Sequence, residues 1–143
     1  MNLDTINLLK ECNAGCKSAT NSMEQVLPYV KDEKLKKTIE ECNEKHIRLG
    51  ERCQELLNEA GENEKDPSPI SKAFSWMSTE MKLMINDKSE KIAKIMIDGC
   101  NMGIKSLAEY LNQYDEANKE AVDVTKELID IEEKFMDELL EYL

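Results

Sequence analysis

Five cysteines and a single histidine are the residues of this sequence with the clearest capacity for chemistry. Cys42, His46 and Cys53 would lie within about 40° of one another on a helix that turns about 100° per residue, so they would share one face. Cys12 and Cys16 are one helical turn apart in an earlier segment. Thiolates with an imidazole can bind zinc tetrahedrally, and thiols suit Cu(I), because soft sulfur ligands match soft ions. The spacing therefore favours a hypothesis of metal or redox chemistry.

A structural interpretation of the same residues stays open beside it. Free cysteine is commonly buried and packs as a small apolar group. His46 could equally be a satisfied polar residue of the core, hydrogen-bonded to Asn13, Thr20 or a glutamate. The sequence has no closely spaced Cys-x-x-Cys pairs, no nucleophile with an adjacent base and no phosphate-binding loop. Catalysis is therefore not predicted.

The elements that must position these residues are helices. Apolar residues recur at alternating steps of three and four, and no stretch has the alternation of a strand. Asp4 is a candidate N-cap, Pro28 should end or kink the first helix, and Gly61 should close the second. Asp87 and Glu90 resemble a capping box for a later helix. The pattern predicts helices over about 4–29, 32–60, 69–85, 87–114 and 116–142.

The lengths of the linkers predict the topology. Four of these helices match one another in length, and two short links join them into two antiparallel hairpins. The segment between the hairpins is long enough to cross a bundle and carries the short helix 69–85. Residues 1–143 are therefore expected to form one all-α domain, a ferritin-like four-helix bundle with an additional helix in its long crossover.

This topology places the reactive residues in layers. Across the first hairpin, Cys16 should lie opposite His46 and Cys12 near Cys53, and the crossover should bring Cys100 to the level of residue 45. The last helix would add a glutamate, although the acidic run 132–141 has the composition of a solvated face. The candidate metal ligands are Cys16, Cys42, His46 and Cys100, with Cys12, Cys53, Glu132 and Glu133 as further candidates for zinc or copper.

A di-iron centre is not predicted. Such a centre in a ferritin-like bundle uses Glu-x-x-His motifs on two helices and single glutamates on the other two. His46 is the only histidine, and Asn43 precedes it where a glutamate is needed. In the last helix, Glu132 is followed three residues later by Phe135.

Composition narrows the partners and the location. The net charge of -11 argues against nucleic acid and against anionic membranes as partners, because both carry negative charge. No apolar run is long enough to span a bilayer, and the first residues lack the basic start and apolar core of a signal peptide. We therefore expect a soluble, cytoplasmic protein whose five cysteines are reduced.

The sequence Cys100-Asn101-Met102-Gly103, in the 87–114 segment, resembles a motif of a bacterial family of small ferritin-like four-helix-bundle proteins with no established function. Members of that family carry a sequence similar to Cys-Glu-x-Gly-Glu-Asp at this position. Cys100 and Gly103 match that pattern. An aromatic crossover helix precedes the motif in the family, as Lys72-Ala73-Phe74-Ser75-Trp76-Met77 does here. Asn101, Ile104 and Lys105 stand where the family has acidic residues. The resemblance implies a ferritin-like fold without an assigned activity.

These observations lead to two functional hypotheses from different classes. The first is a non-catalytic ferritin-like bundle with an interaction or stress-related role, which could self-associate along a helix face. The alternative is a soft-metal or redox protein that uses the central Cys/His layer. An oxidoreductase with a remnant site is the least favoured, because the first and third bundle helices offer no inward carboxylate at the level of His46.

Overall fold

The computed structural model describes residues 1–62 and 88–143, and this part of the chain is helical without strands. Its helices are α1 (Leu3–Val26), α2 (Glu33–Glu59), α5 (Ser89–Gln113) and α6 (Lys119–Leu139). Short 3-10 helices, η1 (Leu27–Tyr29) and η2 (Leu140–Tyr142), follow α1 and α6. The all-α prediction is confirmed. The predicted helix 69–85 lies outside the described residues.

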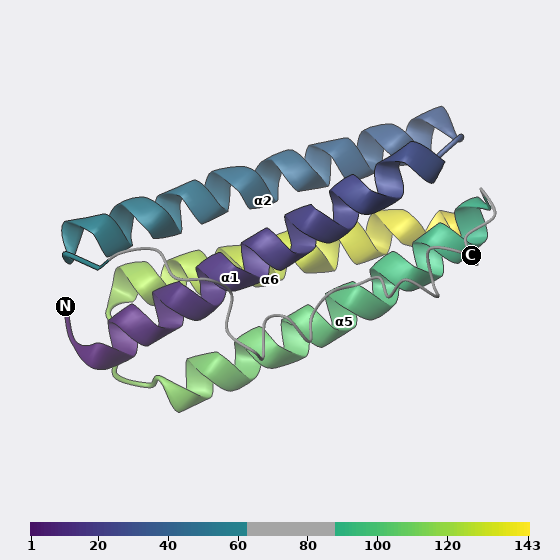
Figure 1. The fold of residues 1–143 in the computed structure, drawn as a ribbon. Helices are drawn as coiled ribbons and strands as arrows, with labels where there is room; N and C mark the ends of the chain where they lie inside the picture. Colours follow the sequence, from purple (N-terminus) through teal and green to yellow (C-terminus); the bar gives the residue numbers. More distant parts are fainter. Residues whose placement is uncertain (63–87) are drawn as a thin grey trace.

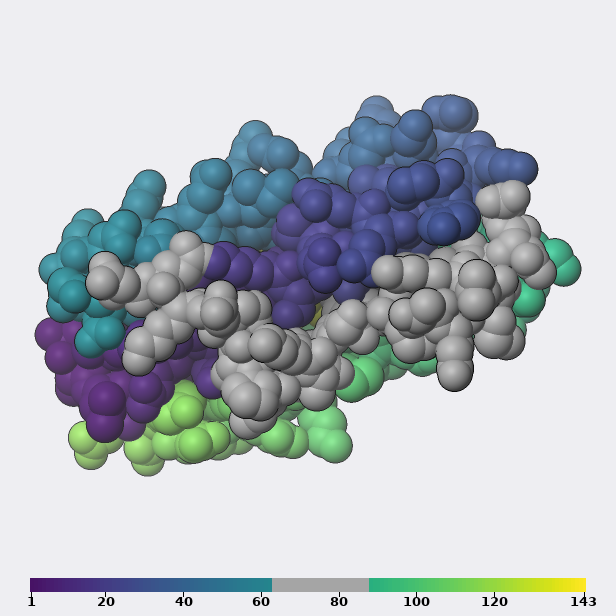
Figure 2. Space-filling view, in the orientation of Figure 1, coloured from purple at the N-terminus to yellow at the C-terminus, as the bar shows by residue number. Residues whose placement is uncertain are grey.

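The four long helices pack side by side as a bundle (Figure 1). α1 and α2 run in opposite directions, as do α5 and α6, whereas α2 and α5 run in the same direction. In the space-filling view, α1 and α2 pack against each other from the purple and teal end of the molecule to the blue end (Figure 2). The directions of the helices agree with those expected from the linker lengths.

The ends of α2 agree with the sequence prediction, whereas the starts of α1 and α5 differ from it. The N-cap of α5 is Lys88, which makes no side-chain cap hydrogen bond, and Asp87 of the predicted capping box lies outside the described residues. Asp32 caps α2 by accepting the backbone N–H of Leu35 at 2.9 Å. At the other end of α2, Gly61 adopts a φ of 76°, the left-handed conformation that favours glycine. Asp4, however, is not the cap of α1: Asn2 accepts the backbone N–H of Thr5 at 2.9 Å. Asp4 lies within the first turn.

Asp4 instead helps to join α1 to the turn between α5 and α6. Its Oδ2 accepts the backbone N–H of Glu116 at 3.0 Å, while the side chain of Asn2 donates to the carbonyl of the same residue at 2.7 Å. The Thr5 hydroxyl accepts the backbone N–H of Asn118 at 2.8 Å. Three polar side chains at the start of α1 thus satisfy backbone groups of a distant turn.

The predicted apolar faces match the buried faces best in α2. The residues of α2 that recur at steps of three and four are all buried: Leu35, Ile39, Cys42, His46, Leu49, Cys53 and Leu56. Ala60, which continues this stripe just after the helix, is half-buried. In α1 the stripe through Ile6, Leu9, Asn13, Cys16, Thr20 and Met23 does not account for the whole buried face. Ile6 and Thr20 are only half-buried, whereas Leu8 and Ala19, outside the stripe, are fully buried. The reason is that α1 contacts α2, α5 and α6, so it has neighbours on more than one side.

Among the described helices, none combines the length and hydropathy needed to cross a bilayer.

The side chain of Asn118 offers a test of this framework. Its Oδ1 accepts the backbone N–H of Ala121 at 2.9 Å and so caps α6. Replacing Asn118 with Ala should lower the free energy of unfolding by about 1 kcal/mol, whereas Gly should cost only a few tenths, because glycine is well tolerated at an N-cap. Urea unfolding measures both values. Equal stability of the Ala variant and the parent would contradict the cap.

Candidate functional site

The centre of the bundle contains a buried pair of polar side chains, His46 of α2 and Glu132 of α6. His46 Nε2 lies 3.1 Å from Glu132 Oε1, and the two side chains are 0% and 4% exposed. On its other edge, the imidazole Nδ1 lies 2.8 Å from the carbonyl oxygen of Cys42, one turn earlier in α2. Because a carbonyl oxygen can only accept, Nδ1 carries a proton and donates it. Both ring nitrogens are therefore engaged within the chain.

The contacts of His46 favour its charged form. Burial by itself lowers the pKa of a histidine, but the hydrogen bonds to Cys42 and Glu132 and the charge of Glu132 outweigh it and raise the pKa to about 10. An imidazolium can donate from Nδ1 to the Cys42 carbonyl and from Nε2 to the carboxylate at the same time. At neutral pH the centre is therefore a buried ion pair that links α2 to α6.

A glycine of α5 makes room for this pair. A Cβ atom built on Gly103 would lie 2.8 Å from Glu132 Oε2 and 3.3 Å from its carboxyl carbon. The carboxylate thus lies directly against the α5 backbone. In the described part of the chain, Oε2 is buried and accepts no hydrogen bond. Oε1 accepts from His46, whereas Oε2 has no hydrogen-bond partner among the described residues.

Two thiols complete the surroundings of this pair. Cys42 Sγ lies 3.5 Å from His46 Nδ1, and Cys100 of α5 is fully buried. Burial raises the pKa of the Cys42 thiol, although the adjacent His46 works against that rise. For Cys100, burial and then the negative charge of Glu132 raise the pKa of the thiol. Both side chains are therefore thiols, not thiolates, at neutral pH.

The remaining three cysteines form a second group, in the other half of the core. Cys12 hydrogen-bonds with Cys16 and Cys53, and the contact with Cys16 is the largest of the effects that raise the pKa of the Cys12 thiol well above its ordinary value. The Cys53 pKa is also raised, first by the hydrogen bond with Cys12 and then by burial. The predicted proximity of Cys12 and Cys53 is confirmed.

The structure therefore brings together only some of the candidate metal ligands that were predicted to share one layer. Cys42, His46 and Cys100 lie together as expected, and Glu132 joins them from α6. Cys16 belongs to the other thiol group, although it and His46 both line a groove of about 400 Å³ between α1 and α2. Of the two glutamates proposed for α6, Glu132 faces inward and Glu133 is exposed.

The sequence left open whether Glu132 faces inward, and it missed the role of Gly103. The run 132–141 was expected to be a solvated face, but Glu132 is 3% exposed. The signal was present, because position 132 falls in the buried stripe Leu128, Glu132, Phe135 and Leu139, with steps of four, three and four. Neither composition nor periodicity could have shown that Gly103 makes room for a carboxylate.

The residues present do not fit the di-iron centre of a ferritin-like bundle. The centre holds one histidine and one carboxylate, and Asn43 and Phe135 stand at the positions of further ligands. Across residues 1–62 and 88–143, no three His, Cys, Asp or Glu side chains are arranged so that they could hold a metal ion. Assignment of Cys16, Cys42, His46 and Cys100 as ligands of zinc or copper stays a prediction.

Comparison of the chain with protein-family models, with curated proteins and with solved structures gave no match. The site must therefore be interpreted from its own geometry.

The contact between Gly103 and Glu132 predicts an unusual response to alanine. Gly103→Ala should lower the free energy of unfolding by about 1 to 3 kcal/mol, since the new methyl group would displace a carboxylate that His46 holds in place. Gly15 of α1 is the matched control, because its Cβ would meet only Leu128 Cδ2, at 3.9 Å. Gly15→Ala should raise stability by about 0.5 to 1 kcal/mol through helix propensity. Thermal or urea unfolding of both variants tests the pair, and a stabilising Gly103→Ala would refute the contact.

The ion pair also predicts how stability depends on pH. His46 binds its proton more tightly in the folded chain, so its contribution is complete below pH about 6.5, where the unfolded histidine is also protonated, and is lost as pH rises toward 10. The free energy of unfolding should fall between pH 6.5 and 8 by up to about 1.4 kcal/mol per unit.

The slope reports on His46 alone only up to about pH 8. Above this pH the cysteines of the unfolded chain begin to ionise, while Cys42 and Cys100 beside His46 keep their protons in the folded chain. Those thiols would lower stability further at higher pH. The variant His46→Gln should remove the slope between pH 6.5 and 8. If the parent protein has constant or rising stability across this window, His46 is neutral in the folded state.

Proposed function

We propose that this chain is a non-catalytic four-helix bundle of the ferritin-like type and that it works through interaction with a partner. Support for the ferritin-like order comes from the directions of the helices. Two antiparallel hairpins are arranged so that α2 and α5 run in the same direction, and the chain from Glu59 to Ser89 joins them. A single long connection between two hairpins distinguishes ferritin-like bundles from simple up-and-down bundles.

The observation that carries the proposal is the closed pair of His46 and Glu132. A metal ligand or a general base needs an unprotonated nitrogen, and His46 uses both of its nitrogens as donors inside the chain. A ferritin-like bundle holds its metals in the core, on side chains of facing helices, and the pair joins two facing helices of this core. In this chain we infer that the same position serves to fix the alignment of α2 with α6.

The state of the thiols supports the same conclusion. The thiolate is the form of cysteine that attacks substrates and binds metals, and a reactive cysteine is partly exposed in positive surroundings. All five cysteines are buried. The pKa values of Cys12, Cys42, Cys53 and Cys100 are raised, which favours the unreactive thiol form.

A second candidate function rests on the open oxygen of Glu132. Oε2 is buried, accepts no hydrogen bond within the described residues and lies in the same layer as Cys42 and Cys100. A buried acceptor without a donor is the kind of feature that a bound ion can explain. Together with His46 these side chains offer the donor types of a zinc or Cu(I) site. Binding would have to release protons from His46 and the thiols.

Elemental analysis of protein purified under reducing, oxygen-free conditions without chelator separates the two candidates. We expect zinc and copper far below one per chain and five free thiols. We also expect alkylation in the folded state to be much slower than in denaturant, because the thiols are buried and protonated.

The matched variants are Cys100→Ala, beside Glu132, and Cys53→Ala, in the other thiol group. About one metal ion per chain that is lost in Cys100→Ala and kept in Cys53→Ala would overturn the non-catalytic proposal in favour of the metal candidate. Rapid alkylation of the folded parent would contradict the inert thiols.

A further inference from the structure

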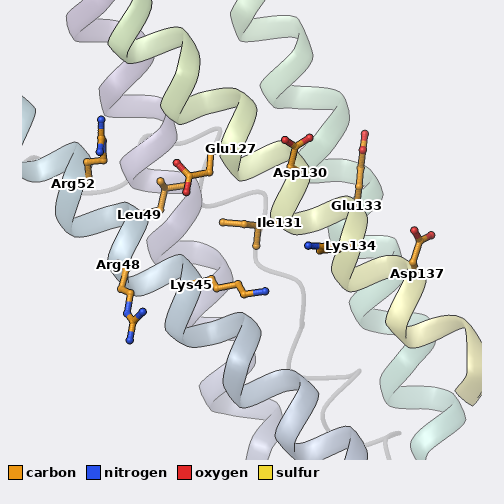
Figure 3. A pocket seen from close by; sticks show the side chains of 10 residues that line it. All are labelled: Lys45, Arg48, Leu49, Arg52, Glu127, Asp130, Ile131, Glu133, Lys134 and Asp137. Carbon is orange, nitrogen blue, oxygen red and sulfur yellow. The ribbon is translucent and has the colours of Figure 1, made fainter.

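The outer surface between α2 and α6 forms a groove of about 710 Å³ with walls of opposite charge (Figure 3). The wall on α2 carries Lys45, Arg48 and Arg52, at steps of three and four that place them on one side of the helix. Leu49 and Ile131 line the groove between the walls. We call this surface the α2–α6 groove.

The wall on α6 is predominantly acidic. Glu127, Asp130, Glu133 and Asp137 line it, with Lys134 among them. All five side chains are exposed, as are the three basic ones opposite. The two walls therefore carry formal charges of opposite sign and similar size.

These charges are not used to close the groove within one chain. Among the described residues, no ion pair of 4 Å or less crosses it. Arg48 pairs instead with Glu44 of its own helix, at 3.2 Å. Both walls keep a row of charged groups directed to the outside.

The contact between His46 and Glu132 fixes which residues of the two walls are level. Because α2 and α6 run in opposite directions, each step forward on α2 matches a step back on α6. Arg48 is then level with Asp130, and Lys45 is level with Glu133. By the same count Arg52 falls within one residue of Glu127. The basic and acidic rows therefore have matching spacing.

We propose that the α2–α6 groove is a self-association surface whose occupant is a second copy of this chain. A two-fold axis parallel to the groove would keep each residue at the same position along the direction of the helices. It would place the basic wall of each copy opposite the acidic wall of the other. A surface with this property is self-complementary, as an isologous dimer requires. The pairing also neutralises charge locally in a chain whose net charge is -11.

This inference rests on the proposed interaction role, since it names the partner and the surface. It accounts for two rows of opposite charge that are level but make no ion pair with each other across the groove within one described chain. A different protein with one charged face would complement only one of the walls, whereas a second copy complements both.

Charge reversal of each wall, followed by mixing, tests the proposal. One variant carries Lys45→Glu with Arg52→Glu, and the other carries Glu127→Lys with Glu133→Lys. Sedimentation over about a hundredfold range of concentration should show a monomer–dimer equilibrium for the parent. Each variant alone should have its dimer dissociation constant raised by about a hundredfold or more, because like charges would then face each other.

An equimolar mixture of the two variants should regain dimerisation, because every wall again meets its opposite. A control with the same change in net charge as the first variant, Lys36→Glu with Lys105→Glu, should dimerise like the parent. Lys36 lies half a turn from Lys45 around α2, and Lys105 lies on α5. Circular dichroism of each variant checks that the helices are retained.

The proposal is overturned by a parent that stays monomeric, by a dimer that neither reversal weakens, or by variants that fail to recover when mixed. These outcomes differ from a failure of the proposed function. A monomeric protein without metal would leave a non-catalytic bundle with another partner, whereas stoichiometric metal would overturn the function whatever the oligomeric state.

Discussion

The carboxylate of Glu132 is the group on which the centre of this bundle depends. It is charged, almost fully buried and anchored on one oxygen by His46. A buried carboxylate without a partner costs several kcal/mol, so its presence constrains the helices around it. α2 must supply the imidazole and α5 must supply a residue without a side chain, Gly103, at the same level as α6. The contacts of this one side chain therefore align three helices, α2, α5 and α6.

The same pair explains why a centre rich in thiols is chemically quiet. A negative charge beside Cys100 opposes formation of a thiolate there, and burial acts in the same direction on Cys42. His46 lowers the pKa of the Cys42 thiol, but burial outweighs this effect and the pKa stays above its ordinary value. The Cys, His and Glu side chains of this centre are of the types that bind soft metals. Their contacts with one another instead stabilise protonated thiols and an internal ion pair. The chemistry of the residues is set by which of them meet, and not by their types alone.

The fold was largely predictable because helix periodicity is a local signal. The stripe of α2 through Leu35, Ile39 and Cys42 and the end at Gly61 follow from spacing and from the conformational freedom of glycine. The site was predictable in part, because counting levels across a hairpin brings Cys12 to Cys53. The inward position of Glu132 could have been predicted as well, since it falls in the stripe of Leu128, Phe135 and Leu139. The close approach of Gly103 to this carboxylate could not, because it depends on how α5 packs against α6. Asp4 was misjudged for a similar reason: its hydrogen bond is to Glu116, a residue distant in sequence.

The inner and outer contacts between α2 and α6 are related through this alignment. His46 and Glu132 hold the two helices at a fixed level from the inside, and the same alignment places Arg48 level with Asp130 across the outer groove. A shift of one helix by a single turn would move the basic row by four residues relative to the acidic row and destroy the match. A buried ion pair is weak evidence for stability, because apolar replacements are often as stable. Its value here would lie in specificity, since it selects the one alignment of α2 and α6 in which the charged walls can recognise a second copy.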